Sequence, residues 1–111
     1  MKEGDVIVVP MPQADGKVKN RPAIVLRKMP PFGDALVCGV STQFHLAAKD
    51  FDEVISRSDP DFASSGLIEE SLIRLGFMVV IPSAKIVGAI GSISSERHKS
   101  LLQRLSDYLV K

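Results

Sequence analysis

Short apolar runs, each closed by proline or glycine, are the feature that most limits what this chain can fold into. Each run is too short for a stable helix and rich in the residues that favour strands. Proline removes a backbone donor and glycine permits turns, so loops and hairpins should separate the runs. The predicted strands, six or seven in number, lie at residues 5–9, 21–26, 35–42, 51–55, 71–75, 77–81 and 86–90.

The end of the chain changes period and predicts a single helix. Its apolar residues recur at helical spacing on one face, namely Leu101, Leu102, Leu105, Tyr108 and Leu109. Ser94 or Ser95 is placed to cap the first turn, and Glu96 within that turn favours the helix dipole. Many short strands followed by one terminal helix indicate a mainly β (β plus α) fold, in which the helix packs on a small, strongly bent sheet or barrel.

Length and charge limit the classes of function. The 111 residues suit one domain spanning 1–111, and 45% hydrophobic with 24% charged residues is a globular composition. The formal net charge is +1, so no overall positive field is available to hold nucleic acid. Any nucleic-acid site must therefore be a local patch.

Metal and cofactor chemistry find no support in the sequence. Cys38 is the only cysteine and the two histidines, His45 and His98, are far apart in sequence, so no Cys/His metal pattern or redox pair can be assembled. We expect no cofactor and no metal, and we expect Cys38 to be an inert core residue. The N-terminus shows neither a secretory signal nor a membrane span, which predicts a cytoplasmic protein without membrane contact.

Charge is unevenly distributed along the chain. Residues 15–28 are mostly basic, and residues 50–70 are mostly acidic. A loop in which Lys17 and Lys19 lead to Arg21 can grip phosphates, because lysine supplies a point charge and arginine a bidentate fork. The alternative interpretation is an ordinary solvated hairpin loop.

Four stretches of sequence resemble the MazF/PemK/Kid family of toxin–antitoxin ribonucleases, in the family's order. They are Gly4-Asp5-Val6-Ile7-Val8-Val9, Asn20-Arg21-Pro22-Ala23-Ile24-Val25-Leu26, Val40-Ser41-Thr42-Gln43 and Lys85-Ile86-Val87-Gly88-Ala89-Ile90-Gly91-Ser92-Ile93-Ser94. The resemblance implies an SH3-like small β-barrel of the CcdB/PemK/MazF type with a C-terminal helix. It also implies the toxin of a type II toxin–antitoxin system, usually a homodimer, that cleaves single-stranded RNA without a metal.

The resemblance also implies a catalytic pair. The arginine of the Arg-Pro pair and the first hydroxyl residue before the glutamine match Arg21 and Ser41. A fixed guanidinium beside a hydroxyl can assist attack by the RNA 2′-hydroxyl and stabilise the phosphorane, which yields a 2′,3′-cyclic phosphate and a 5′-hydroxyl. The remaining predicted RNA-binding residues are Lys17, Lys19, Thr42 and Gln43.

The chain departs from the family pattern at three places. Ser41 stands where threonine is common, which keeps the hydroxyl but loses the restricted rotamer. The loop at residues 12–20 lacks the residues that are common in this loop of the family, so the loop's role in positioning substrate does not carry over. A second family arginine matches Val79, and the loss of such a cation is expected to cost about 10²-fold in rate.

These departures keep a second class of function open. The alternative is a catalytically degraded relative that acts as an antitoxin-, DNA- or gyrase-binding module. The Arg21/Ser41 pair favours the nuclease, whereas Val79 favours the degraded relative. Expected partners are an antitoxin protein and single-stranded RNA, with operator DNA bound by the toxin–antitoxin complex. His45, close after Gln43, is a further acid–base candidate, although a loop histidine is usually only exposed.

Overall fold

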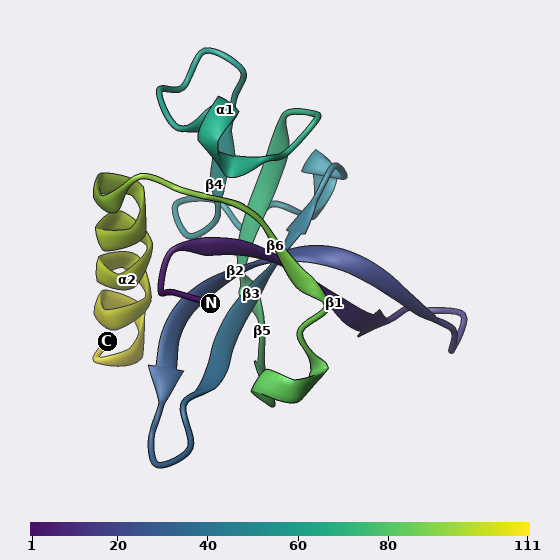
Figure 1. Cartoon of the computed structure of the whole chain (residues 1–111). Coiled ribbons are helices and arrows are strands. Elements are labelled where there is room, and N and C mark those ends of the chain that lie inside the picture. Colours follow the sequence, from purple (N-terminus) through teal and green to yellow (C-terminus); the bar gives the residue numbers. More distant parts are fainter.

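The computed structural model describes all residues, 1–111, and consists of one antiparallel sheet, a C-terminal helix and short helical turns (Figure 1). The six strands are β1 (Asp5–Pro12), β2 (Val18–Met29), β3 (Asp34–Ser41), β4 (Glu53–Ile55), β5 (Ser71–Ile81) and β6 (Gly88–Ser92). Their order in the sheet is β4-β5-β3-β2-β1-β6, so β4 and β6 are the edges. The mainly β prediction is confirmed.

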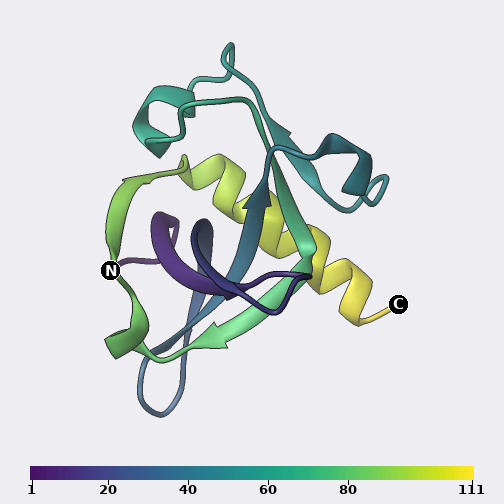
Figure 2. The same cartoon turned by 90° about the vertical axis from the view of Figure 1, so that its right-hand side faces the viewer.

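The sheet curls into a half-barrel and carries helix α2 (Ser95–Leu109) on one side (Figures 1 and 2). Leu101 and Leu105 of α2 are buried against side chains of β1, β2, β3, β4 and β5 in one core cluster. A second cluster, which includes Ile7 and Val25, lies among β1, β2, β3 and β5. Full burial of each such side chain contributes about 1.5–3 kcal/mol, so α2 completes the core that the sheet begins.

No helix has the length and apolar character that a membrane crossing requires.

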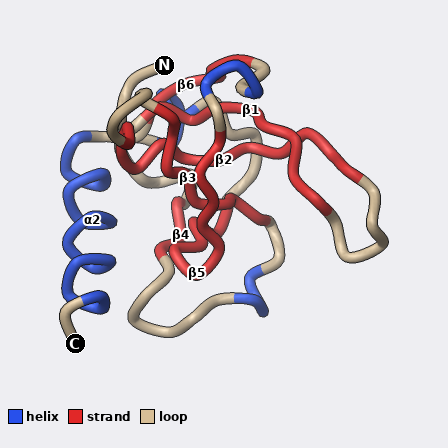
Figure 3. The backbone as a smooth tube through the Cα atoms, turned by 90° about the horizontal axis from the view of Figure 1, so that it is seen from below, coloured by secondary structure: helices blue, strands red, loops and turns tan.

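The β1–β2 hairpin is longer than the sequence predicts, and it extends away from the side of the sheet where α2 lies (Figure 3). β1 continues through Pro10 to Pro12, and β2 begins at Val18. The backbone groups of Pro10 and Pro12 point to the same side of β1 as those of Val8. The Val8 carbonyl points away from β2 and accepts a hydrogen bond from the Val87 amide. The missing N–H groups of the two prolines therefore face the outer edge of β1, where the pairing with β6 has ended, and cost no hydrogen bond.

The second half of the chain also differs in detail from the predicted boundaries. The two strands expected on either side of Gly76 form one strand, β5, with an irregularity at that point, and the last strand begins at Gly88 rather than at residue 86. The segment between β4 and β5, where the sequence predicts no regular element, contains a short helix, α1 (Phe62–Ser65). Gly66 ends α1 with a φ of 74°, and a Cβ there would collide with the carbonyl of Ile90 on β6. Glycine therefore permits both the turn and the close contact.

Helix α2 is capped and anchored by polar side chains. The Ser94 hydroxyl accepts from the Arg97 amide at 3.1 Å, which confirms a serine N-cap. His98 is half-buried, and its Nε2 lies 2.8 Å from the carbonyl oxygen of Leu26 on β2. Tyr108 and Leu109 continue the helical spacing of the apolar face but are exposed. The apolar face therefore contributes to the core mainly through its first part.

Arg97 holds together three segments that are distant in the sequence. Its guanidinium pairs with Asp61 at 2.8 Å, Asp59 at 2.9 Å and Glu53 at 3.1 Å, which ties α2 to β4 and to the turn before α1. Asp61 also accepts from the Ser94 amide. Burial would raise the pKa of the Asp61 carboxyl, but hydrogen bonds from Arg97 and Ser94 outweigh it and hold that pKa below its usual value. Three of the seven acidic residues between 50 and 70 are therefore committed to structure by Arg97.

Removing the Arg97 charge should be costly. We expect Arg97→Met to lower the free energy of unfolding by about 3 kcal/mol, because it leaves largely buried carboxylates without a cation. Arg104→Met is the matched control: Arg104 also pairs with Glu53, but its side chain is 40% exposed, so a loss below about 1 kcal/mol is expected. Urea unfolding followed by circular dichroism measures both values, and equal losses would contradict this account.

The lowered pKa of Asp61 predicts a defined loss of stability in acid. Its stabilising effect is present above the unfolded-state pKa of about 4 and is lost as the pH falls toward the lower folded-state pKa. Asp61→Asn lacks this titration. The difference in unfolding free energy between the wild type and Asp61→Asn should therefore shrink as the pH is lowered from about 6 to about 3. A difference that stays constant over that range would exclude the proposed coupling.

Candidate functional site

The candidate site lies where β2 and β3 separate. β2 pairs with β1 along residues 18–24, but its pairing with β3 ends at Ala23 opposite Gly39. The next rung would join Pro22 to Val40. Pro22 pairs with Val8 in a register that directs its nitrogen away from β1, toward β3, where proline has no N–H to donate. The ladder therefore stops at the Arg-Pro pair, and the two strands diverge.

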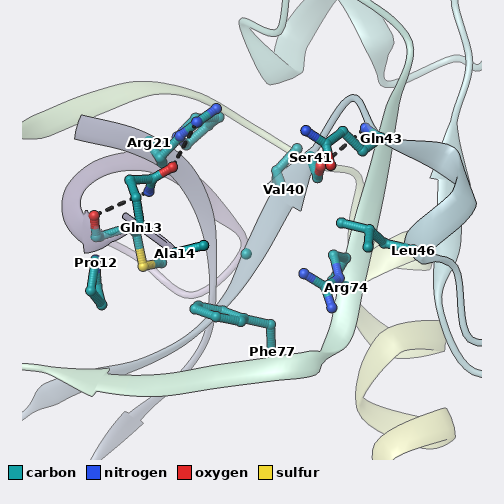
Figure 4. Close-up of a pocket in the computed structure, with 13 residues that line it drawn as sticks. Pro12, Gln13, Ala14, Arg21, Val40, Ser41, Gln43, Leu46, Arg74 and Phe77 are labelled. Carbon is teal, nitrogen blue, oxygen red and sulfur yellow. Dashed lines mark hydrogen bonds between the residues drawn. The ribbon is translucent and has the colours of Figure 1, made fainter. Parts of the chain in front are cut away.

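A pocket of about 380 Å³ occupies this divergence (Figure 4). The β1–β2 hairpin forms one wall, and the end of β3 and the middle of β5 form the other. Its lining residues are Met11, Pro12, Gln13, Ala14, Arg21, Pro22, Gly39, Val40, Ser41, Gln43, Leu46, Arg74 and Phe77. Arg21 and Ser41, which the sequence pairs only by resemblance, thus line one cavity.

Arg21 is held in place by Gln13 across the hairpin. The Arg21 Nη2 donates to the Gln13 Oε1 at 2.8 Å, and the Gln13 Nε2 donates to the carbonyl of Met11 at 3.2 Å. The amide thus links an exposed guanidinium to the backbone of β1. Sequence reasoning assigned no role to Gln13, because the pairing depends on a hairpin register that the sequence does not specify.

Ser41 is oriented by the turn that follows β3. Its Oγ accepts from the amide of Gln43 at 3.0 Å. The hydroxyl proton is therefore free to be donated to another group, because the oxygen serves as the acceptor in the turn. Ser41 is half-buried and Thr42 is exposed, so the end of β3 carries its hydroxyl residues out of the core.

Arg74 is a second candidate residue, besides Gln13, that the sequence did not single out. It lies on β5 opposite Gly39 and lines the same pocket as Arg21. Its Nε is buried without a hydrogen-bond partner, and its guanidinium carbon lies 5.7 Å from the centroid of the Phe77 ring. The signal for Arg74 in the sequence was a single arginine in an otherwise apolar stretch. That it lines the same pocket as Arg21 could be known only from the fold.

The pocket is positively charged and contains no carboxylate or imidazole. The ion pairs of the chain involve Arg27, Arg97 and Arg104, whereas neither pocket arginine takes part in one. Two guanidinium groups and the Ser41 hydroxyl therefore face one cavity as donors. This donor set suits the oxygen atoms of a phosphate group.

The remaining predicted residues have different positions. Gln43 lines the pocket, whereas Lys17, Lys19 and Thr42 are exposed outside its lining. Lys19 lies two residues before Arg21 on β2, so both side chains point to the same face of the hairpin.

Two further candidates lie apart from the pocket lining. His45 belongs to the short helical turn Phe44–Leu46. Val79, opposite Val37, packs against the second core cluster and contributes nothing to the pocket. The pocket nevertheless holds a second cation, Arg74, which sequence reasoning had sought only at position 79.

Cys38 lies in the core behind the pocket. It is completely buried, and burial raises the pKa of its thiol to about 12, with a smaller contribution from the charge of Asp52. A thiol with this pKa is not a nucleophile at neutral pH. The prediction that Cys38 is an inert core residue is consistent with its burial.

Fold and site together define a small half-barrel protein with an arginine-lined pocket where an Arg-Pro pair ends the β2–β3 ladder. The family model described as PemK-like, MazF-like toxin of type II toxin-antitoxin system matches residues 2–109. The chain therefore belongs to this toxin family, as its sequence resemblance indicated.

A solved structure supports the same fold. The Mycobacterium tuberculosis toxin MazF-mt6 superposes with a TM-score of 0.66 over 93% of each chain, at 17% sequence identity. No curated protein sequence matches the chain.

Proposed function

We propose that this chain is the toxin of a type II toxin–antitoxin pair and that it cleaves single-stranded RNA without a metal ion at the pocket between β2 and β3. The observation that carries the proposal is the convergence of Arg21, Arg74 and Ser41 on one cavity that lacks carboxylates. A phosphodiester placed there meets two guanidinium groups that no internal ion pair neutralises. The family membership supports the same chemistry class.

In the proposed reaction, the ribose 2′-oxygen attacks the adjacent phosphorus. The 2′-hydroxyl loses its proton to solvent or hydroxide as a bond forms between phosphorus and the 2′-oxygen. The bond to the 5′-oxygen breaks, and that oxygen takes up a proton from water. The products are a 2′,3′-cyclic phosphate and a 5′-hydroxyl. Arg21 and Arg74 stabilise the charge on the phosphorane oxygens, and Ser41 donates a hydrogen bond to a phosphate oxygen or to the 2′-oxygen.

The residues around the pocket guide the RNA strand. Gln43 lines the pocket and shapes the cleft, and Thr42 follows at its exposed edge. Lys19, and beyond it Lys17, extend the positive charge along the hairpin, so the strand runs along β2 toward Arg21. Their exposure implies a modest, salt-sensitive contribution to binding.

The other partners are proposed from the family. An antitoxin protein neutralises the chain, and operator DNA is bound by the toxin–antitoxin complex. A homodimer in the cytoplasm is the proposed working form. Exposed apolar side chains near the end of β5 and the end of α2 support self-association, namely Met78, Val80, Tyr108 and Leu109.

RNA cleavage in excess EDTA is the direct test of the nuclease. Wild type should cut mixed-sequence single-stranded RNA at discrete positions, leaving cyclic phosphate ends. Arg21→Ala, Arg74→Ala and Ser41→Ala should each lower the single-turnover rate by about 10²-fold, because each removes a preorganised donor. Arg27→Ala is the matched control, since Arg27 lies on the same strand, is largely exposed and lies outside the pocket lining.

Three results would count against the proposal. Equal cutting by all variants would indicate a contaminant or another site. Complete loss of cutting in EDTA, with recovery on adding a divalent ion, would refute metal independence. No cutting of any RNA by wild type would favour the binding-only relative.

The pH dependence of cleavage tests whether a side chain acts as general base. The pocket lining contains no imidazole or carboxylate, so the 2′-hydroxyl must lose its proton to solvent or hydroxide. The single-turnover rate should therefore rise about tenfold per pH unit between about pH 6 and pH 8, without a plateau. A plateau in the rate that disappears in His45→Gln would instead assign that histidine as the base.

A further inference from the structure

Phe77 is an exposed aromatic ring in a polar pocket. Along β5 the register against β3 shifts, so that Met78 is opposite Cys38 while Arg74 is opposite Gly39. Leu75, Gly76 and Phe77 consequently have no partner on β3, and this bulge places Phe77 at the pocket. Its side chain is 38% exposed, although phenylalanine is among the residues most often buried.

The ring is nevertheless held in a defined place. A Cβ added to Gly39 would lie 3.2 Å from the Cδ1 of Phe77, so the ring packs closely on the backbone of β3 and a side chain at position 39 would crowd it. On another side, the Arg74 guanidinium carbon lies 5.7 Å from the ring centroid, within the range of a cation–π contact. Phe77 is thus a fixed surface rather than a loose side chain (Figure 4).

The surroundings of the ring indicate what it binds. Arg21, Arg74 and Ser41 offer donors to a phosphate, and the Gln13 and Gln43 amides also line the cavity. A ligand that fits both features carries a flat, uncharged ring next to an anionic group. Nucleotides of single-stranded RNA have this chemistry, and their bases stack on exposed aromatic side chains.

We propose that Phe77 is the platform on which one base next to the scissile phosphate stacks, which makes the pocket a combined phosphate and nucleobase subsite. This inference rests on the proposed RNA-cleaving function. Arg74 serves both halves, because its guanidinium faces the phosphate position and also contacts the ring that receives the base. Phe77 is a positioning residue, since the reacting atoms lie at the phosphate.

Tryptophan fluorescence gives a direct test, because the chain contains no tryptophan. In Phe77→Trp the new indole is the only one, and its emission should be quenched when a base stacks on it. The probe is a 2′-O-methyl RNA oligonucleotide, which cannot be cut. The matched control is Phe32→Trp, at an 83% exposed position in the turn between β2 and β3, which should show no quenching.

An abasic nucleotide placed at each position of the oligonucleotide in turn identifies the stacked base. Quenching should disappear at one position only. Phe77→Ala should raise the Kd for the intact oligonucleotide about tenfold and leave the Kd for that abasic oligonucleotide unchanged. Phe77→Leu should behave like Phe77→Ala, since an apolar side chain without a ring does not stack.

The outcomes separate this inference from the proposed function. RNA cleavage by wild type without base-dependent quenching in Phe77→Trp would overturn the stacking role alone. Base-dependent quenching without cleavage would keep the subsite and reject the nuclease. Quenching by an apolar peptide but not by the oligonucleotide would assign the ring to a protein partner, and failure of the oligonucleotide to bind at all would reject both.

Discussion

The missing N–H of Pro22 is the constraint on which the site depends. A twelve-residue strand such as β2 would otherwise continue its ladder with β3 past Ala23 and close the sheet over the pocket. Because proline cannot donate the next hydrogen bond, β3 departs there, and Arg21 is left at the mouth of a cavity. The Arg-Pro pair therefore supplies both the opening and a cation beside it. The bulge of β5 completes the opposite wall with Arg74 and Phe77.

The chain uses its arginines in two different ways. Arg97 is surrounded by Glu53, Asp59 and Asp61, and its charge is neutralised in joining α2 to the edge of the sheet. Arg21 and Arg74 take part in no ion pair, so their charge is available to a ligand. Although the net charge of the chain is only +1, the pocket is positively charged because its two arginines have no carboxylate next to them. The neutralised Arg97 attaches α2 to the sheet, and the arginines without ion pairs leave the pocket positively charged.

Much of the fold follows from local sequence. β-Branched runs with proline and glycine breaks predict the strands, and helical spacing after Ser94 predicts α2, because these signals depend on neighbouring residues. The extension of β1 through Pro10 and Pro12 could not be predicted, since it depends on which edge of the strand is unpaired. The site was predicted in part: Arg21 and Ser41 came from the family resemblance. Arg74 and Gln13 were missed because only strand register brings them to Arg21.

In the proposed function, the cavity between Arg21 and Arg74 receives the RNA phosphate. A titration of ¹⁵N-labelled protein with an uncleavable 2′-O-methyl RNA, followed by NMR, tests it most directly, because the Nε–H signals of arginines report on their own contacts. The largest shifts should fall on the Nε–H groups of Arg21 and Arg74 and on the amides of Ser41 and Gln43, with the Arg97 signal unchanged. Shifts concentrated instead on α2 and the adjacent face of β5, with both pocket arginines unaffected, would contradict the account.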